Sequence, residues 1–207
     1  MITKSLTDLE KKKEIFKDSY EINGQLTKIL QRPDYIRAVK KASKFPFNYI
    51  SHFKTSRGNR YTIILTPTNK KREGLTNPLT SIYTKLSTEE GTYMLRYDTI
   101  MYSVTIYTPH FFSRYRSRFL KEGDLSTEEV IDTFAKRNFN IVNSRGDGEE
   151  YIGACTDGYI YLKVKDEGVN IAVTFVSFDM LRDKQKEKID ILLDFIKRIE
   201  EEKCYSK

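Results

Sequence analysis

Short turns, most of them containing glycine, separate runs of β-branched and aromatic residues over much of the chain, and this alternation restricts the fold more than any other feature. The turns are SRGN, STEEG, TDG and DEG, all within residues 47–178. Runs of this kind joined by such short turns are typical of β-hairpins. We therefore predict an α+β fold whose main element is an antiparallel sheet.

Helical periodicity appears before, within and after these strands. Near the N-terminus an apolar stripe carries Leu6, Leu9, Phe16 and Tyr20, and a second helix is predicted beyond NGQ, at RPDYIRAVKKASKF. Two central helices are predicted, one beginning at Thr108 and Pro109 and one capped by Ser126 or Thr127. We expect an N-terminal helical segment over residues 1–46 and an α+β domain over residues 47–207.

The last predicted element is a long C-terminal helix in DMLRDKQKEKIDILLDFIKRIEEEK, capped by Asp179. It is longer than a small sheet needs for cover. We expect it to pack against the N-terminal helices or to mediate self-association.

The charge of the chain restricts its partners. With 207 residues, a formal net charge of +7 and a pI near 9.2, the chain favours anionic partners such as nucleic acid, an acidic protein or a membrane face. No apolar stretch has the length of a signal peptide or a membrane span, so we expect a cytoplasmic protein that does not enter the membrane. Cys155, Cys204, His52 and His110 form no metal-binding motif, and we expect neither a metal nor a cofactor.

The segment TPHFFSRYRSRF, residues 108–119, separates aromatic from basic residues. At 100° per residue, one side of the predicted helix carries Phe111, Phe112, Tyr115 and Phe119, and the other carries His110, Arg114, Ser117 and Arg118. His110 falls in the first turn, where a helix attracts phosphate and disfavours protonation of an imidazole. A neutral histidine beside a phosphate can act as a general base. The alternative is that the basic side is simply solvated.

Three other segments carry candidate nucleic-acid contacts. Arg37, Lys40, Lys41 and Lys44 lie on one side of the predicted second helix, and Lys70, Lys71 and Arg72 lie in the loop NKKREGLTNP. In the strand YIYLKV, the residues Tyr159, Tyr161, Lys163 and Lys165 share a face, and such a face can stack bases and bind phosphates. Our candidates are Lys40, Lys41, Lys70, Lys71, Arg72, Tyr161 and Lys163. A solvated helix face and an ordinary half-exposed strand are the alternatives.

The motifs HFFSRYRSRF, LSTEEVIDTF and GVNIAVTFVS, within residues 100–178, resemble the small ribonuclease toxins of the barnase–EndoU–colicin–RelE superfamily, in particular its BrnT-like branch. The resemblance implies a metal-independent endoribonuclease of toxin or mobile-element type, acting on RNA and partnered by an antitoxin. It implies His110 as base or acid, Arg114 and Arg118 as phosphate ligands, and Thr174 or Ser177 as a polar contact. Tyr107 or Tyr151 would supply the second acid or base.

Two other classes of function stay open beside the ribonuclease. One is a non-enzymatic factor that binds nucleic acid or protein. The other is a metal-dependent nuclease, which is disfavoured because no predicted strand carries Glu-x-Lys or Asp-x-Lys.

Overall fold

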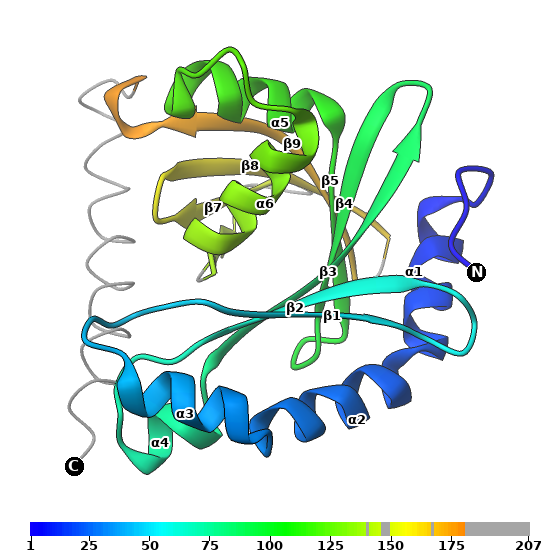
Figure 1. Cartoon of the computed structure of the whole chain (residues 1–207). Helices are drawn as coiled ribbons and strands as arrows, with labels where there is room; N and C mark the ends of the chain where they lie inside the picture. The colour runs from blue at the N-terminus through cyan, green and yellow to red at the C-terminus, as the bar shows by residue number, and fades with distance from the viewer. Residues whose placement is uncertain (140, 146–149, 167, 181–207) are drawn as a thin grey trace.

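The strands of the computed structural model form one mixed sheet (Figure 1). The structure describes residues 1–139, 141–145, 150–166 and 168–180. Its strands are β1 (Tyr49–Lys54), β2 (Arg60–Thr66), β3 (Leu79–Thr88), β4 (Gly91–Asp98), β5 (Ser103–Tyr107), β6 (Val142–Arg145), β7 (Glu150–Cys155), β8 (Gly158–Asp166) and β9 (Val169–Ser177). Their order in the sheet is β1-β2-β3-β4-β5-β9-β8-β7-β6.

One pair of strands shows that the predicted antiparallel sheet is wrong. β5 and β9 run parallel, with Val104 opposite Val169 and Tyr107 opposite Ala172, whereas the other neighbouring pairs are antiparallel. A parallel pair needs a long crossover connection. Here residues 108–168 provide it, because two helices and three strands separate β5 from β9. Short turns report only local hairpins, so they could not reveal this long-range pairing.

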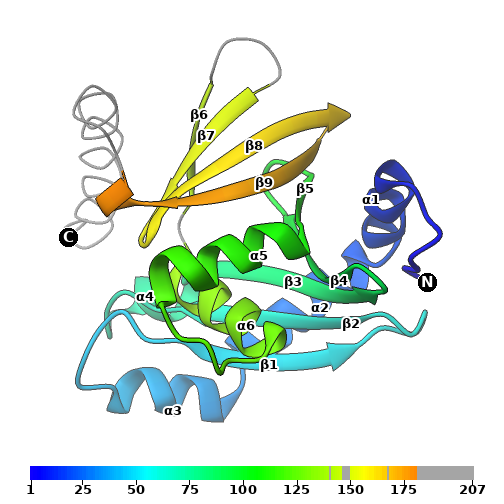
Figure 2. The same ribbon diagram turned by 90° about the horizontal axis from the view of Figure 1, so that it is seen from above.

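Helices lie on both faces of the first half of the sheet. They are α1 (Asp8–Lys17), α2 (Ser19–Leu30), α3 (Pro33–Lys41), α4 (Arg72–Thr76), α5 (Pro109–Tyr115) and α6 (Thr127–Arg137), with a π-helical turn at Arg116–Leu120 and a 3-10 turn at Phe178–Met180. Figure 2 shows that the sheet bends around α5 and α6, so that β1–β4 and β6–β9 lie on two sides of these helices. α2 and α3 cover the opposite face of β1–β4.

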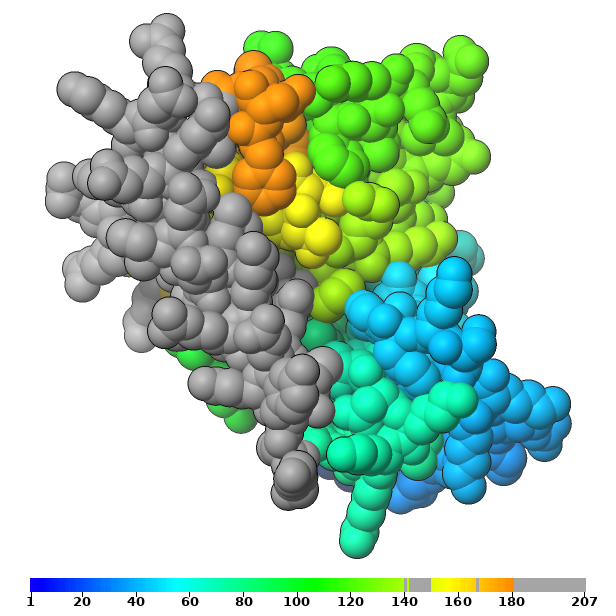
Figure 3. All heavy atoms as spheres, turned by 90° about the vertical axis from the view of Figure 1, so that its left-hand side faces the viewer, coloured from blue at the N-terminus to red at the C-terminus, as the bar shows by residue number. Residues whose placement is uncertain are grey.

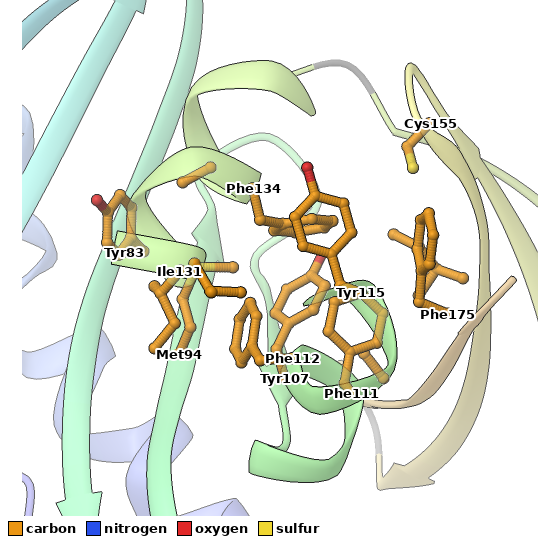
Figure 4. Close-up of a cluster of buried hydrophobic side chains, with 14 of the residues drawn as sticks. Tyr83, Met94, Tyr107, Phe111, Phe112, Tyr115, Ile131, Phe134, Cys155 and Phe175 are labelled. Atoms are coloured by element: carbon orange, nitrogen blue, oxygen red, sulfur yellow. The ribbon is translucent and has the colours of Figure 1, made fainter. Parts of the chain in front are cut away.

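Two hydrophobic cores occupy the two faces. The first lies around α5 and α6 and joins the two halves of the sheet (Figure 4); its largest side chains are Tyr83, Tyr107, Phe111, Phe112, Tyr115, Phe134 and Phe175. The second joins α1, α2 and α3 to the strands; it includes Ile15, Ile22, Ile29, Tyr35 and Val39 together with Ile63, Leu65, Ile82, Leu95 and Val104. The N-terminal helices therefore complete one core of the sheet.

The starts of both central helices are confirmed. Thr108 caps α5, its hydroxyl accepting a hydrogen bond from the amide of Phe111 at 3.2 Å, and Pro109 follows in the first turn. Ser126 and Glu129 form a capping box at the start of α6. A cap and the residue three positions on satisfy amide groups that have no partner within the helix, which is why these local signals were sufficient.

The break between the first two helices lies elsewhere than predicted. The tripeptide NGQ lies inside α2, and the chain changes direction at Asp18 instead. Tyr20, which was placed on the apolar stripe, is 89% exposed. The Asp18 carboxylate is fully buried and accepts hydrogen bonds from the Asn59 side-chain amide at 2.5 Å and the Tyr61 hydroxyl at 2.9 Å. This contact with the β1–β2 hairpin sets the position of the break.

The structure does not test two of the expectations from the sequence. The predicted C-terminal helix, and self-association through it, fall almost wholly in residues 181–207, outside the described residues. The division of the chain at residue 46 stays a prediction. Within the described ranges, no helix has the length and apolar character needed to cross a membrane.

The N-terminal helices and the strands both contribute to the second core, and this generates a test of the division at residue 46. We expect a fragment that starts at Phe45 to lose its cooperative thermal transition, because it would expose the apolar face that α1–α3 cover. Circular dichroism against temperature, with the full chain as control, measures this. A sharp transition in the fragment would instead support an independent domain over residues 47–207.

A cluster of charges joins α1 to the β1–β2 hairpin. The Glu14 carboxylate contacts the Lys17 ammonium at 2.6 Å, the Met1 amino group at 2.7 Å and the Arg57 guanidinium. The Arg57 Nε atom also lies 3.1 Å from Asp18 Oδ1. Lys17 first, then the amino group and Arg57, lower the pKa of Glu14 from 4.5 to about 2.

This lowered pKa predicts how stability changes in acid. A carboxylate whose pKa is depressed on folding stabilises the protein above its unfolded pKa, and that contribution is lost as the pH falls through the folded value. We therefore expect the free energy of unfolding to drop between pH 4.5 and about 2. Glu14→Gln should reduce this drop, measured by urea denaturation across the range. The exposed Glu122→Gln is the control, and an equal drop in both variants would contradict the assignment.

Candidate nucleic-acid interface

α3 and α4 lie side by side at one end of the molecule (Figure 1). The Tyr35 hydroxyl, on the buried side of α3, lies 3.4 Å from the carbonyl oxygen of Gly74 and 3.2 Å from that of Leu75, and donates to them. Tyr35 and Val39 are fully buried, so the opposite side of α3 faces outward. These contacts bring two segments that are distant in the sequence to one surface.

The loop before α4 is held by its own hydrogen bonds. The Asn69 side-chain oxygen accepts from the amide of Lys71 at 2.9 Å. A β-carbon on Gly74 would lie 2.1 Å from the carbonyl oxygen of Asn69, so only glycine allows the loop to fold this closely onto α4. The loop therefore holds Lys70 and Lys71 next to Arg72, the first residue of α4.

Seven exposed cations make up what we call the α3–α4 basic surface: Arg37, Lys40, Lys41, Lys44, Lys70, Lys71 and Arg72. On α3, Arg37, Lys40 and Lys41 fall within about 100° of each other around the helix axis. Figure 3 shows the two segments next to each other on one face. The amphipathic pattern of α3 produces this arrangement, since its apolar residues are used by the core.

These cations are not neutralised by the described part of the chain. None of the seven forms an ion pair with a described residue. Of the carboxylates on these helices, Asp34 accepts a hydrogen bond from the Tyr49 hydroxyl at 2.6 Å, which lowers its pKa, and Glu73 is half-buried. Seven cations beside only two carboxylates on these helices create a net positive potential that attracts phosphate groups.

The structure therefore brings together five of the seven predicted nucleic-acid contacts: Lys40, Lys41, Lys70, Lys71 and Arg72. It does not bring Tyr161 and Lys163 to this surface. Both lie on β8, where the Tyr161 hydroxyl and the Lys163 ammonium each lie 3.3 Å from the Glu150 carboxylate. Both side chains are exposed, so their role in stacking and phosphate binding stays a prediction.

The predicted catalytic stripe lies on the exposed side of α5. The His110 imidazole is exposed, and its Nε2 atom lies 3.4 Å from the Arg114 Nε atom, which donates to it. Neither residue lines the cavity that β3, β4, β5, β8 and β9 enclose. Among the described residues, no group of histidine, cysteine, aspartate and glutamate side chains is placed to hold a metal ion.

Arg118 and Ser177 have structural partners. An Arg118 Nη1 group donates to the carbonyl oxygen of Phe175, which joins the π-helical turn to β9. Burial, followed by the nearby Arg114, lowers the pKa of the Arg118 guanidinium. The Ser177 hydroxyl is buried and donates to Asp179. Both side chains are therefore engaged within the fold.

The other residues of the predicted ribonuclease site are not brought to His110. Thr174 pairs with Tyr161, while the next pair, Phe175 with Ile160, points into the core under α5. Since neighbouring residues of a strand face opposite sides, Thr174 lies on the far side of the sheet from α5. Tyr107 is in the core, where burial raises its pKa to about 12, and Tyr151 packs against the same core.

A buried charge network connects α5 and α6 to the β7–β8 turn, and nothing in the sequence pattern pointed to it. The Asp157 carboxylate is 1% exposed and accepts hydrogen bonds from the Tyr115 hydroxyl at 2.6 Å, the Asn138 side-chain amide at 2.9 Å and two groups of Arg137. These donors satisfy both oxygen atoms of the carboxylate. The TDG turn was visible as a turn, but its aspartate gave no signal of burial.

Comparison with known proteins identifies no relative of this chain. No protein-family model matches the chain. Searches of the curated proteins and of the solved structures also return no match.

Proposed function

We propose that this protein binds nucleic acid through the α3–α4 basic surface and acts as a non-enzymatic binding factor. The observation that carries the proposal is the set of seven exposed cations, contributed by two segments distant in the sequence and without ion pairs to the described residues. Phosphate contacts of this kind dominate the affinity of proteins for nucleic acid.

The mode of binding follows from the residue types on this surface. Lysine and arginine contact phosphates, whereas sequence is read by groups that reach the base edges or stack on bases. The α3–α4 basic surface consists of long cationic side chains on two helices and the segments beside them. Its neighbouring ring, Tyr49, already donates a hydrogen bond to Asp34. We infer binding to the phosphate backbone with little preference for base sequence.

The first test measures how binding of a labelled single-stranded RNA depends on salt. Each cation that neutralises a phosphate contributes about −0.7 to the slope of log K against log salt for a single strand. The double variant Lys40→Gln with Lys71→Gln should bind more weakly and lower the magnitude of the slope by about 1.4. Fluorescence anisotropy measures both quantities, and a duplex DNA probe tests whether RNA is preferred.

The matched control removes two exposed lysines at the other end of the molecule, Lys13→Gln with Lys54→Gln. It changes net charge equally, so it should weaken binding only slightly. If both double variants lost the same affinity, the attraction would come from overall charge and the α3–α4 basic surface would have no specific role.

Metal-independent RNA cleavage is the second candidate. In its favour, His110 and Arg114 place an imidazole and a guanidinium side by side on the exposed side of α5. The elements β5, α5, α6 and the later strands also follow in the order that the resemblance implies. Against it, Arg118 and Ser177 have partners within the fold and Thr174 faces the other side of the sheet. General acid–base catalysis needs a second group within reach of the substrate.

A cleavage assay separates the two candidates. We expect RNA incubated with the full chain in chelator to stay intact while it is bound, and His110→Ala to leave binding unchanged. Gel electrophoresis of the labelled RNA provides the measurement. Cleavage by the wild type that disappears in His110→Ala and survives in the double lysine variant would replace the binding proposal with a ribonuclease.

A further inference from the structure

A cavity of about 680 Å³ lies where β3, β4 and β5 meet β8 and β9. It is distinct from the α3–α4 basic surface and includes no residue of the α5 stripe. Its size falls within the usual range for small-molecule sites, about 300–1,000 Å³. The question is what chemistry its walls would recognise.

One wall carries three polar side chains in a row. Arg96 on β4 is directly opposite Thr105 on β5, and Thr105 is directly opposite Asn170 on β9. Residues paired in this way point to the same face of a sheet, and all three line the cavity. No described residue makes a hydrogen bond to the side chain of Thr105 or Asn170. Their donor groups are therefore open to a ligand.

Arg96 carries a positive charge that the described residues do not neutralise. Its guanidinium donates to the carbonyl oxygens of Asn138 at 3.1 Å and Phe139 at 2.8 Å, and it forms no ion pair with a described carboxylate. These two bonds hold the group in place and leave further N–H donors. A half-buried charge without a counter-ion is costly, so an anion in the cavity would be favoured.

Apolar side chains form another part of the cavity wall. Phe139, Ile141 and Leu162 line it, and so do Ile100 and Met101 from the β4–β5 turn. Ile100 is 85% exposed and Met101 is 74% exposed. The Asp98 carboxylate holds this turn by accepting from the amides of Ile100 at 2.8 Å and Met101 at 2.9 Å. An apolar ligand body could cover this exposed surface.

Two features set the charge of the ligand. The cavity has one guanidinium, whereas its other donors are neutral, and this combination suits a single negative charge. Asp98 is exposed and lines the same cavity, so its carboxylate would repel a doubly charged anion more strongly than a singly charged one. A carboxylate also matches the planar fork of a guanidinium.

We propose that this cavity binds a small organic monocarboxylate, with its carboxylate on Arg96, Thr105 and Asn170 and its apolar body against Phe139, Ile141, Leu162 and the β4–β5 turn. Arg96 was not among the predicted site residues. In the sequence, Arg96 stands two positions after Met94, and residues two apart on a strand point to the same side. This position on the apolar side of a strand was the feature that could have identified it.

The test uses the full chain and four probes: octanoate, 4-phenylbutyrate, octanamide and octyl phosphate. We expect at least one of the two carboxylates to bind with a dissociation constant in the millimolar range or below. Where octanoate binds, octanamide and octyl phosphate should bind more weakly than octanoate. Isothermal titration calorimetry measures the affinities. If neither carboxylate binds, or if octanamide binds as tightly as octanoate, the proposal is overturned.

Variants locate the site. Arg96→Met keeps the length of the side chain and should weaken carboxylate binding by about tenfold or more, because hydrogen bonds to charged groups are the stronger ones. Thr105→Val keeps the shape, leaves the carbonyl contacts of Arg96 intact and should weaken binding severalfold. Arg60→Met, at an exposed position of β2 outside both proposed sites, is the matched control and should bind like the wild type. Unchanged binding in both Arg96→Met and Thr105→Val would contradict the assignment, and Thr105→Val remains decisive if Arg96→Met does not fold.

Discussion

The packing of α5 and α6 inside the bend of the sheet is the constraint on which the rest of the structure depends. Their rings contact strands from both halves, with Phe134 beside Tyr107 and Tyr115 beside Phe175 (Figure 4). Large aromatic side chains bury a large apolar area, and their rings prefer edge-to-face contacts such as that between Tyr115 and Phe175. Because β5 leads directly into α5, this packing also brings β9 back beside β5 as its parallel neighbour.

Polar contacts fix the position of these layers. Asp157 connects Tyr115 of α5 and Arg137 of α6 to the β7–β8 turn, and Asp18 connects the α1–α2 junction to the β1–β2 hairpin. A buried carboxylate is tolerated only when hydrogen bonds and a cation replace its water. Each of these two groups therefore requires one arrangement of its neighbours, which apolar packing alone would not specify.

Two features of the structure carry the proposed binding sites. The α3–α4 basic surface exposes cations on the outside of the helices, and the cavity beside Arg96 exposes donors at the junction of the two halves of the sheet. We propose that the first binds a polymer of phosphates and that the second binds a small anion with an apolar body. No residue of the α3–α4 basic surface lines the cavity.

Local features were decided by the sequence itself. The start of α5 at Thr108, the capping box of α6 and the hairpins follow from interactions between residues close in the chain, and so did the separation of aromatic from basic residues in TPHFFSRYRSRF. The basic composition of residues 37–44 and 70–72 was likewise visible. Tertiary structure alone decided that these two segments meet and that β5 pairs with β9. It also decided that Arg118 and Ser177 bind partners within the fold. In the same way, it placed Arg96, Thr105 and Asn170 on one wall of the cavity. The physical reason is that such contacts join residues far apart in the chain, where neither periodicity nor turn chemistry records which surfaces will be brought together.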